Sequence, residues 1–370
     1  MTFSYWEYKS WLTNIDFTVV GSGIVGLNCA LSLKKKYPQA KILVLEKGIL
    51  PQGASTKNAG FACFGSISEI VSDLNDHTEN EVVALIQKRW KGIQLLRQNL
   101  GDKQIDFQNH GGHEVFMYYD EKLYENCLEN LDKINALTRP IYKEKAFKKH
   151  ANTFEFDKVK EHYITNHFES QIDTGKMMSA LLNKVLMNDI KILNSVSVKE
   201  FVENNDHVLV KTNQFDFSTN KLLIATNGFA SQLLNEQVQP ARAQVLITKP
   251  IKNLHIKGTF HLDQGYYYFR NIDDRVLFGG GRNIDFKTET TTVLGETKQI
   301  QNKLEKMLKE IILPNTFFEV DYSWSGIMGL GKTKNPIVKQ VSENVYCGVR
   351  LGGMGIAIGS FVGKELSEIV

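Results

Sequence analysis

The sequence predicts an α/β fold in which both ends of the chain contribute to one domain and a β-rich segment is inserted between them. Three observations predict it. Residues 15–46 run strand, glycine turn, helix and strand. Residues 345–370 again run strand, glycine turn and helix, and residues 241–283 are dense in strand-like sequence with glycine-rich ends. Helices that alternate with strands are typical of a parallel sheet covered by helices.

The first of these segments has the full pattern of a dinucleotide-binding unit. The apolar run 15–20 leads into the motif GSGIVG, then a helix and a second strand. Gly21 makes the tight turn, Gly23 leaves room for a pyrophosphate, and Gly26 lets the helix pack closely on the sheet. Glu46 ends the second strand, where it is placed to accept a hydrogen bond from a ribose hydroxyl. A carboxylate there would repel a 2′-phosphate, so the motif favours FAD or NAD over NADP.

The overall composition is that of a globular protein and has no nucleic-acid or membrane signature. The chain has 370 residues, of which 42% are hydrophobic and 23% charged, and its net charge of +3 is spread along the sequence. The densest basic run, residues 34–36, is expected at the solvated end of a helix. Residues 1–7 lack the pattern of a targeting signal, and no run is apolar enough to span a membrane.

Cysteine and histidine usage favours a reduced protein without a metal site. The four cysteines are scattered and form no CxxC motif, which is typical of a cytoplasmic protein. His110 and His113 come nearest to a pair of metal ligands, but the two glycines between them indicate a turn. The sequence therefore predicts no metal, and it leaves the oligomeric state open.

The other elements follow from periodicity, in chain order. After Glu46, the small and glycine-rich residues 47–62 predict a loop whose backbone can press against a flat group. Helices are expected at 80–100, 121–137, 174–187 and 296–312, and from 355 to the C-terminus. Strands are expected within 105–119, at 190–193, 195–198, 208–212 and 221–228, within 241–283, and at 345–349. Asp173 is the predicted N-cap of the helix at 174–187.

One motif does not fit its context. Residues 326–333 match the phosphate-binding pattern GxxxxGK[ST]. A phosphate-binding loop of this kind needs a helix that begins at the Lys-Thr pair, so that N–H groups point at the phosphates. Asn335-Pro336 and strand-like residues follow instead. We therefore exclude ATP binding at this segment.

Several short motifs occur in a specific order over nearly the whole chain. They are GSGIVG (21–26), Glu46-Lys47, GASTKNAG (53–60), ATNG (225–228), GGGR (279–282), WSG (324–326) and GGMG (352–355). With this order and spacing, the chain resembles the D-amino-acid-oxidase family of flavoproteins, which includes glycine oxidase, sarcosine oxidase and gamma-glutamylputrescine oxidase. The opening SYW at residues 4–6 is similar to the last of these branches.

The resemblance implies that FAD is the cofactor. In such proteins the early loop passes along the flavin ring and the ATNG turn packs near the pyrophosphate and ribose. The last glycine motif presents N–H groups and a helix N-terminus to the flavin pyrimidine, where they stabilise negative charge on the reduced ring. The implied cofactor-binding residues are Gly21, Gly23, Ile24, Val25, Gly26, Glu46, Lys47, Ala54, Ser55, Thr56, Asn58, Ala59, Gly60, Val198, Ala225, Thr226, Asn227, Gly228, Arg350, Gly352, Gly353, Met354 and Gly355.

The resemblance also implies that FAD is bound without a covalent link. Members that bind flavin covalently use a His in the early loop or a Cys near the C-terminus. Asn58 stands at the position of that His, and Cys347 lies within the last predicted strand rather than in the segment before it.

The predicted substrate side departs from the family pattern. In amino-acid-oxidising members, an Arg soon after Trp-x-Gly binds the substrate carboxylate, and Met328 occupies this place. Either Arg350 supplies the charge, or the substrate is an amine without an α-carboxylate. Alternation in the strand predicts that Tyr266 and Tyr268 share one face, which we expect to line the pocket. Met328, Arg350 and these two tyrosines are the catalytic-site candidates.

Together these features predict an FAD-dependent oxidoreductase that oxidises a C–N bond of an amine or amino acid to an imine by hydride transfer to flavin N5, with O2 as acceptor. Two alternatives stay open: a dehydrogenase of a 2-hydroxy acid or amine that uses an electron carrier, and a flavin-binding protein without turnover. A Rossmann-like FAD-binding domain is expected at 1–80, 146–238 and 322–370, and a β-rich substrate-binding domain at 81–145 and 239–321.

Overall fold

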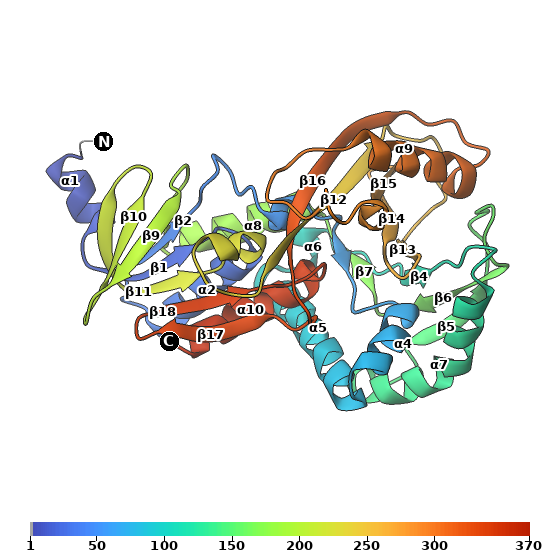
Figure 1. Ribbon diagram of the computed structural model, residues 1–370, viewed down its shortest axis with the longest axis horizontal. Helices are drawn as coiled ribbons and strands as arrows, with labels where there is room; N and C mark the ends of the chain where they lie inside the picture. The colour runs from blue at the N-terminus through green and yellow to red at the C-terminus, as the bar shows by residue number, and fades with distance from the viewer. Residues whose placement is uncertain (1–2) are drawn as a thin grey trace.

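The computed structural model describes residues 3–370 and has two lobes, each built on an eight-stranded sheet (Figure 1). Residues 1–2 lie outside the described residues; they open the predicted FAD-binding domain and the stretch that lacks a targeting signal. The N- and C-terminal segments lie together in one lobe, and the middle of the chain builds the other (Figure 1). The predicted α/β class with an inserted β-rich part is confirmed.

The first sheet carries the dinucleotide motif. Its strands are β1 (Ile15–Val20), β2 (Ile42–Leu45), β8 (Lys191–Leu193), β9 (Val198–Glu203), β10 (Val208–Thr212), β11 (Asp216–Ile224), β17 (Ile337–Ser342) and β18 (Val345–Val349). The order is β17-β18-β11-β1-β2-β8, with β10 and β9 attached to β11. The strands from β18 to β8 are parallel. The loops that follow β1, β11 and β18 therefore meet at one edge of the sheet.

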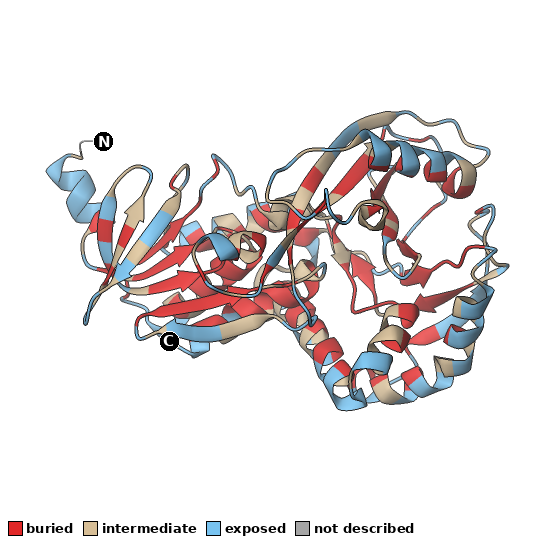
Figure 2. Ribbon diagram, in the orientation of Figure 1, coloured by how far each residue is buried: buried red, intermediate tan, exposed pale blue. Residues whose placement is uncertain are grey.

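Apolar helices cover one face of this sheet. They are α2 (Ile24–Lys36), α5 (Glu79–Leu100), α8 (Thr174–Met187) and α10 (Gly355–Glu368). α10 packs against both α2 and α5, and their buried side chains form the largest core (Figure 2). Glycines permit this close contact: a Cβ at Gly363 would lie 2.6 Å from the Val25 carbonyl oxygen, and one at Gly92 would lie 2.1 Å from that of Ala357.

The second sheet is mostly antiparallel. Its strands are β4 (Gly112–Glu114), β5 (Phe147–Ala151), β6 (His162–Asn166), β12 (Gln239–Thr248), β13 (Thr259–Leu262), β14 (Tyr267–Ile272), β15 (Arg275–Gly280) and β16 (Val320–Leu330). The order is β16-β12-β15-β14-β13-β4-β6-β5. One face packs on α9 (Lys298–Met307) and the π-helical turn η4 (Leu308–Ile312) in a core rich in phenylalanine. The opposite face of the sheet is turned towards the first lobe.

The remaining elements are short or connect the lobes. They are α1 (Tyr5–Glu7), η1 (Tyr8–Leu12), α3 (Ala54–Lys57), β3 (Phe61–Ala62), α4 (Ile67–Asp76), α6 (Asp102–Ile105), α7 (Glu121–Tyr142), β7 (Ser170–Gln171), η2 (Asn227–Gln232) and η3 (Arg282–Ile284). The sequence patterns did not predict α4, which begins at a capping box formed by Ser66 and Glu69. None of the helices in residues 3–370 is long and apolar enough to cross a membrane.

Local predictions hold best where a cap or a long periodic run defines the element. α8 has the predicted bounds, and Asp173 caps it by accepting a hydrogen bond from the Lys176 N–H at 2.9 Å. The segment 105–119 was expected to hold strands, but only β4 forms, because a turn with Gly111 at φ +87° precedes it. The early loop contains one helical turn, α3. Residues 326–333 lie in β16 and the bend after it, so the helix that a phosphate-binding loop needs is missing there.

The division into two domains stays a prediction, but the sheets argue against several of its boundaries. β5, β6 and β16 belong to the second sheet, whereas the predicted boundaries place all or most of their residues in the FAD-binding domain. α5 packs against α10 in the first lobe, whereas residues 81–145 were expected in the substrate-binding domain. A strand or helix pattern shows what an element is, but it does not show which sheet the element joins.

Candidate active site

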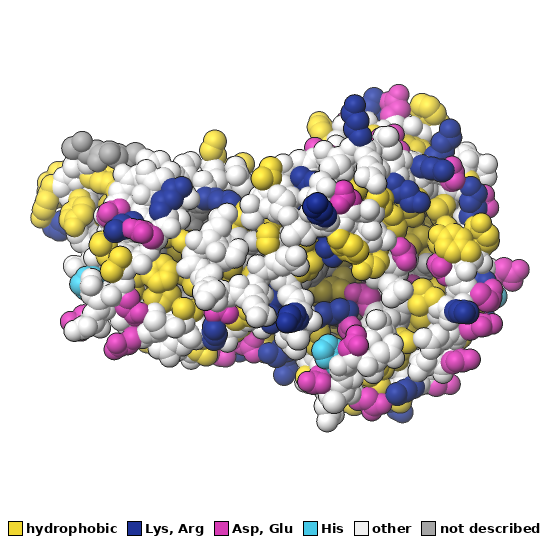
Figure 3. Space-filling view, viewed as in Figure 1, with side chains coloured by type: hydrophobic (Ala, Val, Ile, Leu, Met, Phe, Trp, Pro, Cys, Tyr) yellow, Lys and Arg dark blue, Asp and Glu magenta, His cyan; other side chains and the backbone are white. Residues whose placement is uncertain are grey.

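A cavity of about 650 Å³ lies between the two lobes. Figure 3 shows that the molecule is hollowed at this place. The cavity is lined by the glycine turn after β1, the early loop, the C-terminal glycine motif and one face of the second sheet. Motifs that are far apart in the sequence therefore share one site.

The glycine turn after β1 forms one end of the cavity. Gly21 has φ +110°, and a Cβ there would lie 2.8 Å from the Ala225 carbonyl oxygen. A Cβ at Gly26 would lie 1.9 Å from the Gly21 carbonyl oxygen, so α2 can approach the turn only because residue 26 is glycine. The first N–H of α2, that of Ile24, donates to Ser55 Oγ at 2.9 Å. This bond ties the early loop to the N-terminus of α2.

Glu46 and Lys47 lie beside this turn. The Glu46 carboxylate accepts hydrogen bonds from Ser22 Oγ at 2.7 Å and from the Gly48 N–H at 2.9 Å. These bonds fix the carboxylate at the cavity wall, and its predicted role with a ribose remains a prediction. Lys47 Nζ lies 3.3 Å from the centre of the Phe229 ring. Burial lowers the pKa of Lys47, and the charge of Glu46 opposes this shift.

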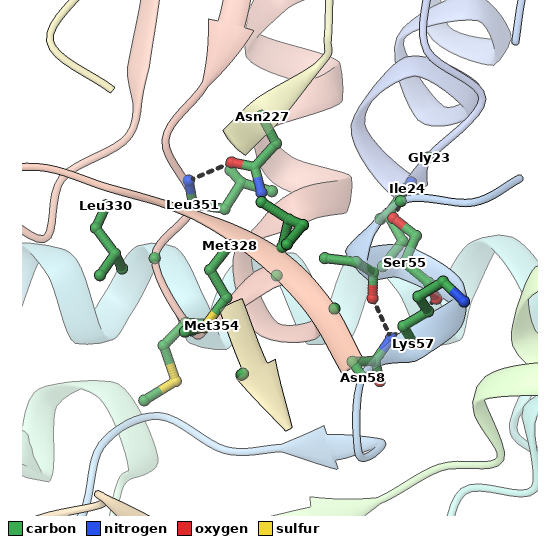
Figure 4. A pocket seen from close by; sticks show the side chains of 18 of the residues that line it. Gly23, Ile24, Ser55, Lys57, Asn58, Asn227, Met328, Leu330, Leu351 and Met354 are labelled. Atoms are coloured by element: carbon green, nitrogen blue, oxygen red, sulfur yellow. Dashed lines mark hydrogen bonds between the residues drawn. The ribbon is translucent and has the colours of Figure 1, made fainter. Parts of the chain in front are cut away.

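The early loop is held by its own polar groups. Asn58 Nδ2 donates to the Ser55 carbonyl oxygen at 2.9 Å (Figure 4). Asn58 Oδ1 accepts from Thr174 Oγ1 at 2.9 Å. Trp324 Nε1 donates to the Lys57 carbonyl oxygen at 3.0 Å. The loop is thus attached to both the start of α8 and strand β16, which gives its cavity-facing backbone a fixed position.

The C-terminal glycine motif forms the middle of the cavity. Asn227 Oδ1 accepts a hydrogen bond from the Leu351 N–H at 3.0 Å (Figure 4). Gly352 has φ +61°, and a Cβ there would have no atom within 4 Å. Met328 Sδ lies 3.8 Å from the position of a Cβ at Gly353. α10 begins after Met354 without a side-chain cap, so its first N–H groups are available to a ligand.

Most of the predicted site residues line this cavity. From the cofactor set they are Gly21, Gly23, Ile24, Val25, Glu46, Lys47, Ala54, Ser55, Asn58, Ala59, Val198, Ala225, Thr226, Asn227, Gly352, Gly353, Met354 and Gly355; from the catalytic set they are Tyr266, Tyr268 and Met328. Lining a cavity does not prove a role, so their functions remain predictions.

Four predicted cofactor-binding residues do not line the cavity but pack behind it. Gly26 faces the turn at Gly21, as described above. Thr56 Oγ1 turns back and donates to the Pro51 carbonyl oxygen at 2.8 Å. A Cβ at Gly60 would lie 2.4 Å from the Ile172 carbonyl oxygen, and one at Gly228 would lie 2.5 Å from that of Met328. The last two glycines therefore allow backbone segments to cross closely.

Arg350 is also not among the cavity-lining residues, which corrects its predicted place beside the flavin. Its side chain packs on Gly331, Nε donates to the Asn335 carbonyl oxygen at 3.1 Å, and a terminal nitrogen donates to Thr333 Oγ1 at 3.3 Å. Its backbone has φ +65°, which turns the chain at the end of β18. The side chain consequently points to the segment after β16 and away from the cavity.

A row of side chains crosses the second sheet on its cavity side. The register pairs Glu114 with His261, His261 with Tyr268, and Tyr268 with Gly279. A Cβ at Gly279 would lie 2.7 Å from the Tyr268 ring, so the ring rests directly on this glycine. Burial raises the pKa of Tyr268 to about 12, so the phenol keeps its proton near neutral pH. Tyr267 packs into the opposite core, as the alternation predicts.

The structure adds charged residues that the sequence reasoning missed. Glu69 and Asp73 of α4 line the cavity, and Lys334 Nζ lies 2.6 Å from Asp73 Oδ1. Arg282 lines it too, with its guanidinium carbon 4.7 Å from the centre of the Phe286 ring. Among residues 3–370, no carboxylate oxygen lies within 4.0 Å of this guanidinium. Two sequence features could have indicated these residues: the capping-box sequence at 66–69, which begins α4, and the GGGR motif, which ends with Arg282.

The cavity residues fit FAD. The C-terminal glycine turn leaves its backbone uncovered, since a Cβ at Gly352 would have no atom within 4 Å, and the N-termini of α2 and α10 both reach the cavity. The Asn58 amide is engaged within its loop, and Cys347 is buried in β18 and does not line the cavity. Neither of these two residues offers a covalent attachment, and non-covalent binding stays a prediction.

Comparison with known proteins identifies the class. The family described as FAD dependent oxidoreductase matches residues 16–369. The match covers almost the whole chain, so the chain belongs to this family of FAD-dependent oxidoreductases. The predicted resemblance and the predicted FAD cofactor are confirmed.

Individual relatives are distant but cover most of the chain. The chain is 20% identical to the probable oxidoreductase OrdL of Haemophilus influenzae, over 97% of this chain and 83% of the relative. It is 19% identical to gamma-glutamylputrescine oxidoreductase of Escherichia coli, over 96% and 83%. The crystal structure of glycine oxidase from Geobacillus kaustophilus matches with a TM-score of 0.75 at 16% identity, over 96% and 94%. At this identity, the structural match shows a shared fold.

Proposed function

We propose that the protein oxidises a C–N bond of an amine or amino acid to an imine, which water then hydrolyses. The observation that carries the proposal is the continuity of the cavity. It runs from the dinucleotide turn at Gly21 to the sheet row with Tyr268, so a reacting carbon held at the row can meet the flavin end of the cofactor. When bound, FAD accepts the hydride at N5.

The chain itself has to orient the substrate and exclude water. The residues proposed for this are Tyr266 and Tyr268 on the second sheet and Met328 on β16, all of which line the cavity. Tyr268 is held on Gly279 and keeps its proton, so it can donate a hydrogen bond but cannot act as a base near neutral pH. Fixed groups of this kind lower the barrier by holding the substrate in a reactive orientation.

An amino acid is the favoured substrate class, because the cavity contains a guanidinium without an acidic partner. Arg282 is only partly exposed, and burial lowers its pKa, while the charges of Tyr266 and Glu289 oppose this shift without forming an ion pair with it. A substrate carboxylate would supply the missing counter-charge. Arg282 therefore replaces Arg350 as the proposed carboxylate-binding residue. Similarity to gamma-glutamylputrescine oxidoreductase keeps an amine substrate as the second candidate.

O2 is the proposed electron acceptor. A dehydrogenase of a 2-hydroxy acid or an amine that uses a carrier is the alternative, and the two differ in how fast air reoxidises the reduced flavin. Membership in an oxidoreductase family argues against the further alternative of a flavin-binding protein without turnover. The expected cytoplasmic location remains a prediction, and the oligomeric state stays open.

The test is anaerobic reduction of the FAD-loaded protein. Amines, amino acids and 2-hydroxy acids are added in turn, and loss of the yellow flavin absorbance is recorded. We expect bleaching by amino acids or amines and rapid recovery on admitting air. Bleaching by hydroxy acids alone would contradict C–N oxidation. Slow recovery in air but fast recovery with a dye acceptor would favour the dehydrogenase.

A further inference from the structure

We propose that the buried guanidinium of Arg270 stabilises the negative charge that FAD gains on reduction, and so raises the midpoint potential of the bound cofactor. Uptake of a hydride adds one negative charge to the flavin, and a cation held near the flavin end of the cavity favours that reduced form. The inference needs only the FAD cofactor, so it does not depend on which substrate the protein oxidises.

Arg270 lies on the cavity side of the second sheet. Side chains alternate along β14, so Arg270 faces the same side as Tyr268, which lines the cavity, whereas Tyr267 packs into the opposite core. The register pairs Arg270 with Leu277, in the row next to that of Tyr268. Since the predicted adenosine side of the cavity lies at Glu46, we expect the flavin at this sheet.

The guanidinium lies directly behind the early loop. Nη1 of Arg270 donates to the Gly60 carbonyl oxygen at 3.2 Å and to that of Ile172 at 2.8 Å. A Cβ at Gly60 would lie 2.9 Å from the same nitrogen, so the loop can pass this close only because residue 60 is glycine. The neighbours of Gly60 in sequence, Ala59 and Phe61, line the cavity. The backbone of the early loop therefore stands between the charge and the cavity.

The charge of Arg270 has no acidic partner. The side chain is buried, and among residues 3–370 no carboxylate oxygen lies within 4.0 Å of its guanidinium. Two aspartates of the surroundings, Asp106 and Asp173, are instead paired with Lys176 at 3.0 and 3.8 Å. Within the same described part of the chain, Nε of Arg270 has no hydrogen-bond partner. A buried cation without a counter-charge is unfavourable, and a negative charge that forms nearby relieves that cost.

Arg270 carries its charge near neutral pH. Burial lowers the pKa of Arg270 to about 10, and the charges of three nearby aspartates oppose this shift. The side chain is therefore protonated at neutral pH, and its hydrogen bonds fix the charge in place before the cofactor is reduced. A fixed charge in the protein interior acts more strongly than one in solvent, because little has to reorient when negative charge appears.

The first test compares the wild-type holoprotein with free FAD. The midpoint potential of the bound flavin is measured anaerobically with a chemical reductant and a reference dye, so no substrate is needed. We expect a potential above that of free FAD, because a protein that binds reduced FAD more tightly than oxidised FAD must raise its potential. A potential equal to or below that of free FAD would overturn the inference.

The second test uses Arg270→Met, which removes the charge, and Arg270→Lys, which keeps it. Arg270→Met should weaken binding of reduced FAD roughly tenfold more than binding of oxidised FAD. For a two-electron couple this ratio lowers the midpoint potential by about 30 mV. Arg270→Lys should stay near the wild-type potential. An unchanged potential in Arg270→Met, or an equal drop in both variants, would overturn the inference, because the second result assigns the effect to the hydrogen bonds alone.

Arg275→Met is the matched control. Arg275 lies on the neighbouring strand β15, pairs with Asp321 and does not line the cavity, so its loss should leave the potential unchanged. A drop as large as that of Arg270→Met would contradict a specific role. If Arg270→Met does not fold, Arg270→Gln takes its place, since its amide can still donate to the loop. A wild type that no amine reduces would overturn the proposed function and leave this inference standing.

Discussion

Asn227 and Leu351 are joined by a hydrogen bond of 3.0 Å, although 124 positions separate them in the chain. Asn227 lies just after β11 and Leu351 just after β18, and these two strands are parallel neighbours in the first sheet. The bond therefore links two loops at the edge where they reach the cavity. It also fixes the backbone that leads into the last glycine motif and α10.

Replacing Asn227 with alanine should weaken FAD binding. The substitution removes the acceptor of the Leu351 N–H, and a lost neutral hydrogen bond costs about 1 kcal/mol, which corresponds to roughly fivefold weaker binding. The dissociation constant of FAD can be measured by the recovery of its fluorescence on release. Asn130→Ala, at a partly exposed position of α7 that does not line the cavity, is the control and should bind FAD like the wild type. Equal affinity of both variants would contradict the assigned role of the bond.

Replacing Arg282 with methionine should separate amino acids from amines. Loss of a charge-assisted pair with a carboxylate should raise KM for amino acids roughly tenfold to a hundredfold and leave KM for amines without a carboxylate unchanged. Arg350→Met is the matched control, since its side chain lies on Gly331 outside the cavity. If Arg350→Met raises KM and Arg282→Met does not, the sequence-based choice of Arg350 was right after all.

The dinucleotide end of the site could be predicted from the sequence, because its features are local. A tight turn at Gly21, a helix that begins three residues later and a carboxylate at the end of the next strand all follow from residues 15–46. The same holds for α8, whose N-cap and apolar period lie within one segment. Such elements depend on neighbours in sequence, which the pattern contains.

Tyr266, Tyr268 and Met328 could be predicted as residues of the second sheet's side of the cavity, but other residues there could not, because their place depends on strand register. His261 becomes a cavity residue only because β13 pairs with β14 opposite Tyr268 and with β4 opposite Glu114. β4 is more than 100 residues away from β13, and its short pattern shows neither its partner nor its face. The expected place of the Arg350 side chain beside the flavin does not agree with the structure for a related reason. Its proximity to Gly352 in sequence suggested the flavin edge, but a positive φ turns its side chain outwards.

The buried His113 should make stability depend on pH. Burial lowers the pKa of His113 to about 3, and the charges of His150 and His261 add to this shift. The folded protein thus keeps His113 neutral while the unfolded chain takes up a proton below about pH 6.5. Above that pH, His113 costs the folded state no free energy of unfolding. As the pH falls from about 6.5 towards about 3, the free energy of unfolding decreases, by near 2 kcal/mol at about pH 5. Urea unfolding of wild type and His113→Gln, each at about pH 7 and about pH 5, tests this prediction. The free energy of unfolding should fall less between the two pH values in the variant than in the wild type.

The contact between Tyr268 and Gly279 predicts that Gly279→Ala will damage both fold and site. The new Cβ would lie 2.5 Å from Val245 Cγ1 and 2.7 Å from the Tyr268 ring, so both contacts have to be relieved by a shift of these side chains or of the strand. Crowding of this kind typically costs about 1–3 kcal/mol, which should lower the midpoint of urea unfolding.

The kinetic effect of Gly279→Ala should go beyond its loss of stability. A displaced Tyr268 ring enters the cavity, so KM should rise even at temperatures where the variant is fully folded. Gly53→Ala is the control for stability, because a Cβ at Gly53 would have no atom within 4 Å and its φ of −75° suits alanine. A Gly279→Ala protein that unfolds at the wild-type urea midpoint and keeps the wild-type KM would show that the ring does not rest on this glycine in solution.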